Sequence, residues 1–212
     1  VLGLTTTSRN INTIRRLISK YEQVDLDLMV KIVPYSKAWP AEFEALAGDL
    51  KFVLGELALR IDHIGSTSIP GLAAKDVIDI QITVRELSSE ITQRMQSAGY
   101  HVPNGTYRDH CVPGIPGGDE QWEKMLFGAK AGDRRTNIHV RTKGRANQRY
   151  AILFRDYLRE HPATAEAYGE LKRLLAVSLA NPDDYPDVKD PAVDLIYLAA
   201  EEWAAINNWQ IS

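Results

Sequence analysis

The stretch HIGSTSIPGLAAKDVIDIQITV, residues 63–84, constrains the fold more than any other part of the chain. Its second half alternates between two kinds of side chain, as a strand with two different faces requires. One face carries only aliphatic residues: Ile78, Ile80, Ile82 and Val84. The opposite face carries Val77, Asp79, Gln81 and Thr83. We therefore predict a strand whose polar face presents an acid and an amide.

A tight turn comes directly before this strand. Gly65 has no Cβ, so the backbone can turn sharply there. Three residues with hydroxyls that can donate to a phosphate follow it: Ser66, Thr67 and Ser68. Lys75 comes next, and its ammonium either reaches the same anion as a point charge or is solvated at a helix end. The turn predicts a phosphate-binding site at the start of the strand.

Asp79 and Gln81 point the same way because they are two residues apart on the strand. Two acids in these positions could hold Mg²⁺ and leave room for substrate phosphates. A Gly-Ser turn followed by Asp-x-acid on a strand is the layout of a nucleotidyltransferase site. Here Gln81 replaces the second acid and offers one neutral oxygen. We expect a degenerate site in which Asp79 holds Mg²⁺ or another divalent metal weakly.

A second strand is expected to extend the polar face. The segment TNIHVRT, residues 136–142, places three polar residues on one face: Asn137, His139 and Arg141. If this strand neighbours residues 76–84, His139 and Asp79 could meet there. The pair could bind a softer metal such as Zn²⁺ or Mn²⁺ or act as catalytic residues in acid–base chemistry, or His139 could simply hydrogen-bond to Asp79. Arg141 would add a phosphate-binding cation.

The remaining pattern mixes strands and helices first and becomes helical from about residue 145. A short N-terminal helix is expected in an extension over residues 1–30, and one domain over residues 31–212. VKIVPY, residues 30–35, and QWEKMLFGAK, residues 121–130, have strand-like content, and the latter forms a hairpin with residues 136–142. Residues 103–119 have no periodicity and are typical of a lid or a disordered loop.

Helical stripes supply the rest of the expected core. The first begins at Trp39 and ends at Leu57, and the second lies between Leu87 and Ala98. Tyr168, Leu171, Leu175 and Leu179 form a further stripe in the helical third. Arg155 and Asp156 are expected to form an ion pair that docks this third against the sheet. The fold class is thus α/β (α+β): a nucleotidyltransferase-like mixed sheet flanked by helices.

The composition limits the classes of binding partner and the cellular location that we expect for this chain. The chain has 212 residues, a net charge of −3 and one cysteine, which suits a cytoplasmic protein. We expect no membrane span and no signal peptide. Residues 134–149 hold six Arg or Lys and no acid. That stretch either lies on a solvated surface or attracts phosphate. The negative net charge of the whole chain disfavours nucleic acid as the partner.

Several separated segments resemble one known family in order along the chain. They are DHIGSTSIPGLAAKDVIDIQITV, NIHV, FRDYLREHP, AYGELKRLLA and YPDVK. These segments look like the GrpB family, from about Val33 to about Trp203. The resemblance implies a nucleotidyltransferase-like fold, found alone or fused to dephospho-CoA kinase. No Gly-x-x-x-x-Gly-Lys motif of such a kinase occurs in this sequence.

Two functions remain open at this point. The first is a nucleotidyltransferase, or a protein that binds a nucleotide or another phosphate-bearing small molecule, with a degenerate metal site. The alternative is a non-catalytic folding or protein-interaction module, related to the domain fused to dephospho-CoA kinase. A third option, nucleic-acid binding through residues 134–149, is disfavoured by the net charge.

Overall fold

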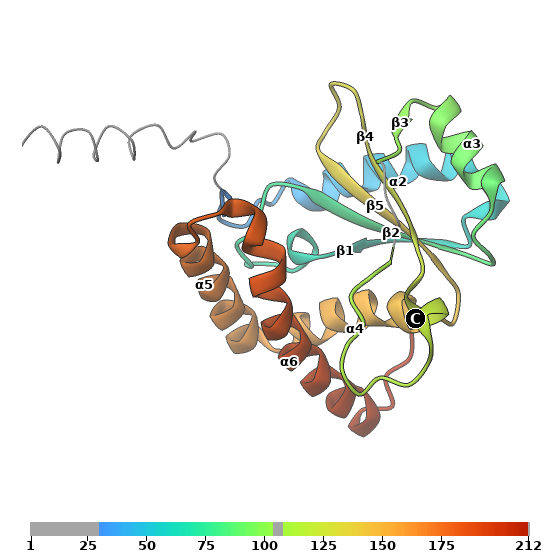
Figure 1. Cartoon of the computed structure of the whole chain (residues 1–212). Helices are drawn as coiled ribbons and strands as arrows, with labels where there is room; N and C mark the ends of the chain where they lie inside the picture. Colours follow the sequence, from blue (N-terminus) through green and yellow to red (C-terminus); the bar gives the residue numbers. More distant parts are fainter. Residues whose placement is uncertain (1–29, 104–107, 212) are drawn as a thin grey trace, which may run out of the picture. The chain divides into compact units, whose positions relative to one another are not determined.

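The computed structural model describes residues 30–103 and 108–211 (Figure 1). Within it, Lys31–Ser212 form one compact unit. The N-terminal helix expected near Ile11 lies outside the described residues. None of the helices in the described ranges is both long enough and apolar enough to cross a membrane.

A mixed sheet of five strands forms the centre of this unit. The strands are β1 (Arg60–Ile64), β2 (Ile78–Val84), β3 (Tyr100–His101), β4 (Met125–Lys130) and β5 (Thr136–Thr142), and their order is β1-β2-β5-β4-β3. The central pair, β2 and β5, is parallel, and the other pairs are antiparallel. The expected hairpin of β4 and β5 and the expected α/β class are therefore confirmed.

One sequence-based strand is wrong. Residues 30–35 form no strand, and only Val33 makes an isolated bridge, to Ala74. The neighbouring Pro34 explains this, because proline has no backbone N–H to donate to a ladder.

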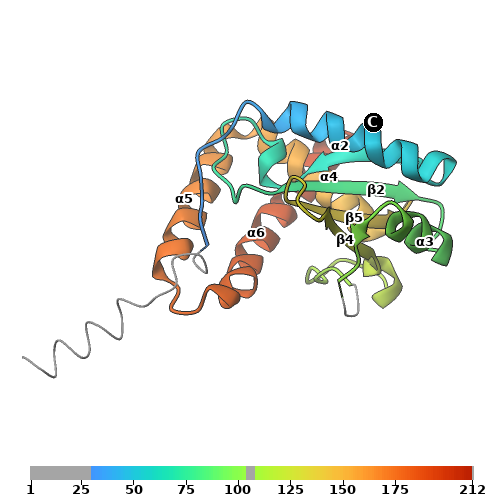
Figure 2. The ribbon, with the colours of Figure 1, turned by 90° about the horizontal axis from the view of Figure 1, so that it is seen from above.

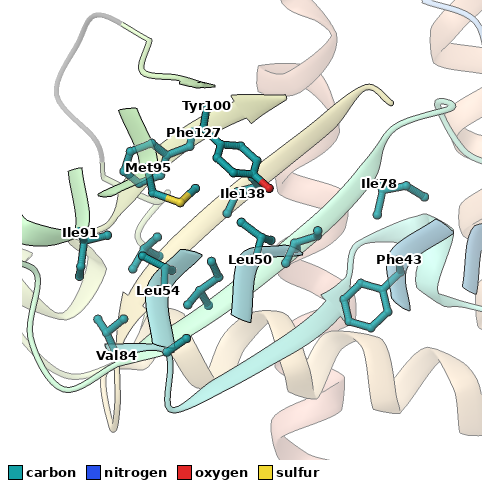
Figure 3. Packing of buried hydrophobic residues seen from close by; sticks show 14 of the residues in the cluster. Phe43, Leu50, Leu54, Ile78, Val84, Ile91, Met95, Tyr100, Phe127 and Ile138 are labelled. Carbon is teal, nitrogen blue, oxygen red and sulfur yellow. The ribbon is translucent and has the colours of Figure 1, made fainter. Parts of the chain in front are cut away.

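Two helices cover the aliphatic face of the sheet. They are α2 (Trp39–Leu54), followed by the short helix η1 (Gly55–Leu57), and α3 (Ser89–Ser97). Figure 3 shows how Leu50, Leu54 and Met95 from these helices meet the strand residues Ile78, Phe127 and Ile138. The helices form where the sequence predicted them, because their apolar residues recur with helical spacing.

The C-terminal helices lie on the other side of the sheet, where the first of them contacts the strands and the other two pack against the first (Figure 2). They are α4 (Ala146–Glu160), α5 (Pro162–Ser178) and α6 (Tyr185–Ile206). The short helix η3 (Asp119–Trp122) precedes β4, and η4 (Pro182–Asp184) precedes α6. A second apolar core lies among them, and includes Leu72, Trp122, Leu153, Phe154, Leu158 and Tyr197. The expected helical C-terminal third is confirmed.

The stripe predicted for α5 needs one correction. The buried residues of this helix are Ala165, Tyr168, Gly169 and Lys172, whereas Leu175 and Leu179 are only half-buried. Leu175 lies in the last turn of α5 and Leu179 directly follows the helix. Leu171 packs partly buried against the second core, and Lys172 beside it is buried.

Helix α4 docks on the sheet through buried polar side chains. Arg155 donates from Nη1 to the carbonyl of His63 at 3.1 Å and to Asp62 Oδ1 at 3.4 Å, and from Nε to Asp156 Oδ1 at 2.7 Å. The ion pair expected of Arg155 and Asp156 therefore does join the helical third to β1. Hydrogen bonding of this kind is required because buried charges are costly without partners.

Candidate functional site

The Gly-Ser turn lies directly against Asp79. Gly65 has φ 68° and ψ −174°, a backbone conformation open almost only to glycine. A Cβ on Gly65 would lie 2.9 Å from Asp79 Cβ and 3.0 Å from Asp79 Cγ, so a side chain would overlap the acid. The short helix η2 (Ser66–Ser68) follows. The turn and the strand acid therefore lie in contact.

Both features open into one cavity of about 550 Å³. Seven of the residues predicted from the sequence line it: Gly65, Ser66, Thr67, Lys75, Asp79, His139 and Arg141. Ser68 and Gln81 do not line it. The described part of the chain thus brings most of the predicted site residues together around the start of β2.

The hydroxyls of the turn have different partners. Ser66 Oγ accepts a hydrogen bond from Lys172 Nζ at 2.7 Å. Thr67 Oγ1 lies 3.0 Å from His63 Nε2, and Ser68 Oγ donates to the carbonyl of Gly65 at 2.6 Å. Because the Ser68 hydroxyl stabilises the turn itself, we remove Ser68 from the set of candidate phosphate-binding residues.

Asp79 pairs with an amide and not with the histidine that the sequence suggested. In the register of the parallel pair, Asn137 lies opposite Asp79, and His139 lies opposite Gln81. Asn137 Nδ2 donates to Asp79 Oδ1 at 2.8 Å. Burial raises the pKa of Asp79, while the bond from Asn137 and the charge of Lys189 act in the opposite direction.

His139 meets a lysine in the cavity. Its Nδ1 lies 3.3 Å from Lys124 Nζ. Burial holds the pKa of His139 well below its ordinary value, and the charges of Arg141 and Lys124 lower it further. The imidazole is therefore neutral near pH 7, and its Nδ1 accepts a hydrogen bond from the ammonium of Lys124.

Gln81 has a structural position. The residue is 0% exposed, its Nε2 donates to the carbonyl of Gln148 at 3.0 Å, and its Oε1 accepts from Arg141 Nη1 at 2.6 Å. This amide therefore joins β2 to α4 and β5. Gln81 is therefore not a candidate ligand-binding residue, because both ends of its side chain bond to protein groups and the residue does not line the cavity.

Asp109, which the sequence analysis missed, neutralises one side of the cavity. Its carboxylate accepts from Arg141 Nε at 2.8 Å and Nη2 at 2.9 Å, from Lys124 Nζ at 2.6 Å and from Asn147 Nδ2 at 3.0 Å. Despite burial, the charge of Arg141 and its hydrogen bonds hold the pKa of Asp109 well below the ordinary range. Asp109 lies in a segment without periodicity, so no sequence signal marked it.

Lys172 is the second residue that the sequence analysis missed. It reaches from α5 to the turn, and its Nζ donates to the carbonyl of Ala73 at 2.5 Å as well as to Ser66. Gly169, one turn earlier, permits this approach, because a Cβ there would already lie 3.2 Å from Leu72 Cδ1. A lysine within a buried helix face was the available signal.

The cavity is strongly basic. Four cations line it near the turn, a group that we call the turn-side cations: Lys75, Arg135, Lys172 and Lys189. Three more line the rest of it: Arg108, Lys124 and Arg141. Its carboxylates are Asp79, Asp109 and Asp190. Burial lowers the pKa of Lys75, and the nearby charges of Lys189 and Arg135 lower it further, as expected where cations converge.

The donors around Asp79 do not suit a divalent metal. One oxygen of Asp79 already accepts from Asn137, Gln81 is bonded elsewhere, and turn-side cations surround the acid. In the described ranges, no group of three or more His, Cys, Asp or Glu side chains is arranged to hold a metal ion. These ranges thus contain no preorganised metal cluster at Asp79 and His139, and the expected Mg²⁺, Zn²⁺ or Mn²⁺ site stays a prediction.

Curated relatives match most of this chain. A dephospho-CoA kinase of Mycolicibacterium paratuberculosis is 34% identical over 196 residues, which cover 85% of this chain and 48% of the relative. The UPF0157 protein YqkA of Bacillus subtilis is 33% identical over 180 residues, with 82% and 48% covered. The chain thus spans about half the length of these relatives.

Solved structures and a family model agree with these matches. The crystal structure of the conserved protein GrpB from Enterococcus faecalis has a TM-score of 0.65 and 29% identity, and covers 82% of this chain and 99% of that one. Structures of the Cid1 poly(U) polymerase match at a TM-score of 0.43 and 12% identity, a likeness too distant to support an argument. The family model described as GrpB protein matches residues 29–198. The chain therefore belongs to the GrpB family.

Proposed function

We propose that this chain binds a phosphate-bearing small molecule, such as a nucleotide, in the basic cavity. One observation carries the proposal: seven basic side chains line the cavity, against three carboxylates. Two of those acids already pair with cations, since Asp109 binds Arg141 and Lys124, and Asp190 lies 3.2 Å from Lys189. The excess positive charge favours an anionic ligand, and phosphate groups supply two charges or more in a small volume.

The size and lining of the cavity favour an organic phosphate. Its volume of about 550 Å³ is typical of sites for small molecules. Aromatic rings of Tyr150, Phe154 and Tyr185 contribute to its wall. Such rings pack well against a flat heterocycle, so a nucleotide would place its phosphates near the turn and its base against these rings.

The names of the relatives point to the same class of ligand. A dephospho-CoA kinase acts on a molecule that contains a nucleotide and a diphosphate. Because this chain spans about half of such relatives, we do not propose the kinase reaction for it. Nor do we propose nucleotidyl transfer, since the donors around Asp79 do not suit the metal ion that this chemistry uses.

Isothermal titration calorimetry with pyrophosphate, ADP and dephospho-CoA tests the proposal. We expect binding of at least one of these anions and none of adenosine, which lacks the charge. The double variant Lys75→Ala/Lys189→Ala should weaken binding about 10-fold or more, since hydrogen bonds to charged groups contribute about 1.5–3 kcal/mol each. Lys143→Ala, on the exposed loop after β5, is the matched control and should bind like the wild type.

Two results would contradict the proposal. One is no binding of any of the three anions; the alternative of a folding or protein-interaction module would then be favoured. The other is equal binding of ADP and adenosine, because the phosphate would then contribute nothing.

A further inference from the structure

Lys172 is a buried ammonium without a carboxylate partner among the described residues. Its side chain is 3% exposed, and its two hydrogen-bond acceptors, Ser66 Oγ and the carbonyl of Ala73, are both neutral. A buried charge is costly unless an opposite charge compensates it, and for this reason buried lysines are normally paired. Because Lys172 lines the cavity, an anion bound there would supply the opposite charge.

Most of the charged groups near Lys172 make its positive charge still less favourable. Lys189 on α6 and Arg173 on α5 oppose its charge, and Asp79 on β2 favours it. The ring of Tyr168 lies 4.6 Å from Nζ and gives only a weak cation–π contact. Burial first, and then Lys189 and Arg173, lower the pKa of Lys172 to about 7. An anion bound in the cavity would favour the charged form of Lys172 and raise its pKa.

A divalent cation would not favour the charged form of Lys172. Proteins that bind nucleotides commonly use Mg²⁺ to neutralise the phosphate charge, and carboxylates hold that ion. Here Asp79 is the carboxylate at the turn, and Asn137 already occupies one of its oxygens. Another cation beside Lys172 and Lys189 would add repulsion and not relieve it.

We propose that Lys172 holds the terminal phosphate of the ligand in place of a divalent cation, so that binding needs no added metal. The inference rests on the proposed function and deepens it by naming the residue and the metal requirement. Ser66 fixes the ammonium at the turn through the 2.7 Å bond, beside Gly65 and Asp79. The positive charge of Lys172 thus replaces the positive charge of a metal ion that would otherwise bind together with the phosphate.

Calorimetry on the full chain with inorganic pyrophosphate tests both parts. Wild-type affinity should agree within about 2-fold between a buffer with EDTA and one with excess Mg²⁺, after correction for the Mg²⁺–pyrophosphate complex. Lys172→Met keeps an unbranched side chain, one atom shorter than lysine and without its charge, and should weaken binding about 10-fold or more. Lys143→Met, on the exposed loop after β5 and outside the cavity, is the matched control and should bind like the wild type.

Thermal unfolding gives a readout that distinguishes ligand binding from a structural role. In phosphate-free buffer, Lys172→Met should unfold at a higher temperature than the wild type, because an unpaired buried charge is removed. Pyrophosphate should stabilise the wild type more than Lys172→Met at the same concentration. A lysine that only supported the fold would show the opposite: a lower unfolding temperature and an unaltered response to pyrophosphate.

The outcomes separate this inference from the proposed function. Unchanged affinity in Lys172→Met, or wild-type binding that appears only with Mg²⁺, would overturn the inference and leave phosphate binding intact. A wild type that binds no phosphate-bearing probe under either condition would overturn both. The comparison with and without Mg²⁺ uses the wild-type chain, so it decides the metal question even if Lys172→Met does not fold.

Discussion

Asp109 and Arg141 form a two-point ion pair, with Nε to Oδ2 at 2.8 Å and Nη2 to Oδ1 at 2.9 Å. The pair joins the long loop before β4 to the central strand β5. Arg141 is 4% exposed and Asp109 is 13% exposed, so neither partner is replaced easily by water. The charge of Arg141, which the sequence analysis assigned to a ligand, is therefore largely satisfied within the protein.

Removing the acid of this pair should destabilise the fold. Asp109→Ala leaves the buried charge of Arg141 without its partner, and we expect a loss of about 3–5 kcal/mol in the free energy of unfolding. Urea denaturation measures it. Asp119→Ala breaks the exposed pair with Arg108 and should cost less than about 1 kcal/mol. Equal losses in the two variants would show that Asp109 is not a structural anchor.

Gly65→Ala should destabilise the protein through both its backbone and its neighbour. The conformation at φ 68° alone costs about 1–3 kcal/mol for a residue with a Cβ, and overlap with Asp79 adds to this. Gly48→Ala is the control, because Gly48 lies in α2 with no atom within 4 Å of its Cβ position. The control should gain about 0.5–1 kcal/mol. If Gly65→Ala leaves the urea midpoint unchanged, the close approach of the turn to Asp79 is wrong.

Gln81→Asp should lower stability without creating a metal site. The shorter acid cannot donate to the carbonyl of Gln148, and a buried acceptor left without its donor costs about 1–3 kcal/mol. The new carboxylate would pair with Arg141. Calorimetry with Mg²⁺ should therefore show no gain over the wild type, and the exposed Gln93→Asp should be close to neutral. A clear gain in Mg²⁺ affinity would revive the degenerate metal site.

Asp79→Asn distinguishes an anion site from a metal-dependent one. In an anion site Asp79 repels the phosphate, so its neutralisation should tighten pyrophosphate binding about 10-fold, equivalent to about 1.4 kcal/mol. Asparagine still accepts from Asn137, so the local structure should persist. Asp133→Asn, exposed and outside the cavity, is the control. Loss of binding in Asp79→Asn would indicate that the carboxylate holds a cation that the ligand needs.

The stability of the unliganded protein should rise between pH 7 and pH 9. The folded-state pKa of Lys172 is about 7, whereas lysine in an unfolded chain titrates near 10.5, so the unfolded state binds more protons throughout this range. Below pH 7 both states are protonated, and the cost of the buried charge is fully present. Urea midpoints across the range measure the slope, and Lys172→Met should flatten it. The same slope in both proteins would assign the effect to other groups.

The parts of the structure that depend on local pattern could be predicted. Strand β2 alternates with period 2, so its aliphatic face and the position of Asp79 followed from the sequence. The turn before it followed from Gly65, because few residues tolerate such a backbone. That β2 and β5 are neighbours was a hypothesis, and the structure confirms it. The strands pair in parallel, in a register that places Asn137 and not His139 opposite Asp79.

The parts that depend on tertiary packing could not be predicted. Asp109 comes from a loop with no periodicity and reaches the site through its pairing with Lys124, directly before β4, and with Arg141 on β5. Lys172 lies 106 residues from its partner Ser66 in the sequence. Gln81 is polar and so suggested a solvent-reached face, but α4 covers that part of the sheet and buries the amide. Each of these positions is set by an element distant in the chain.

The cavity also lies where the two apolar cores adjoin. Lys75 and Arg135 belong to the sheet side, whereas Lys172 and Lys189 project from α5 and α6, whose apolar residues contribute to the second core. An anion held by both groups would be a removable crosslink between the halves. The resistance of the C-terminal helices to proteases would then follow the concentration of ligand in the cell, which gives even a purely binding protein a way to report on its metabolite.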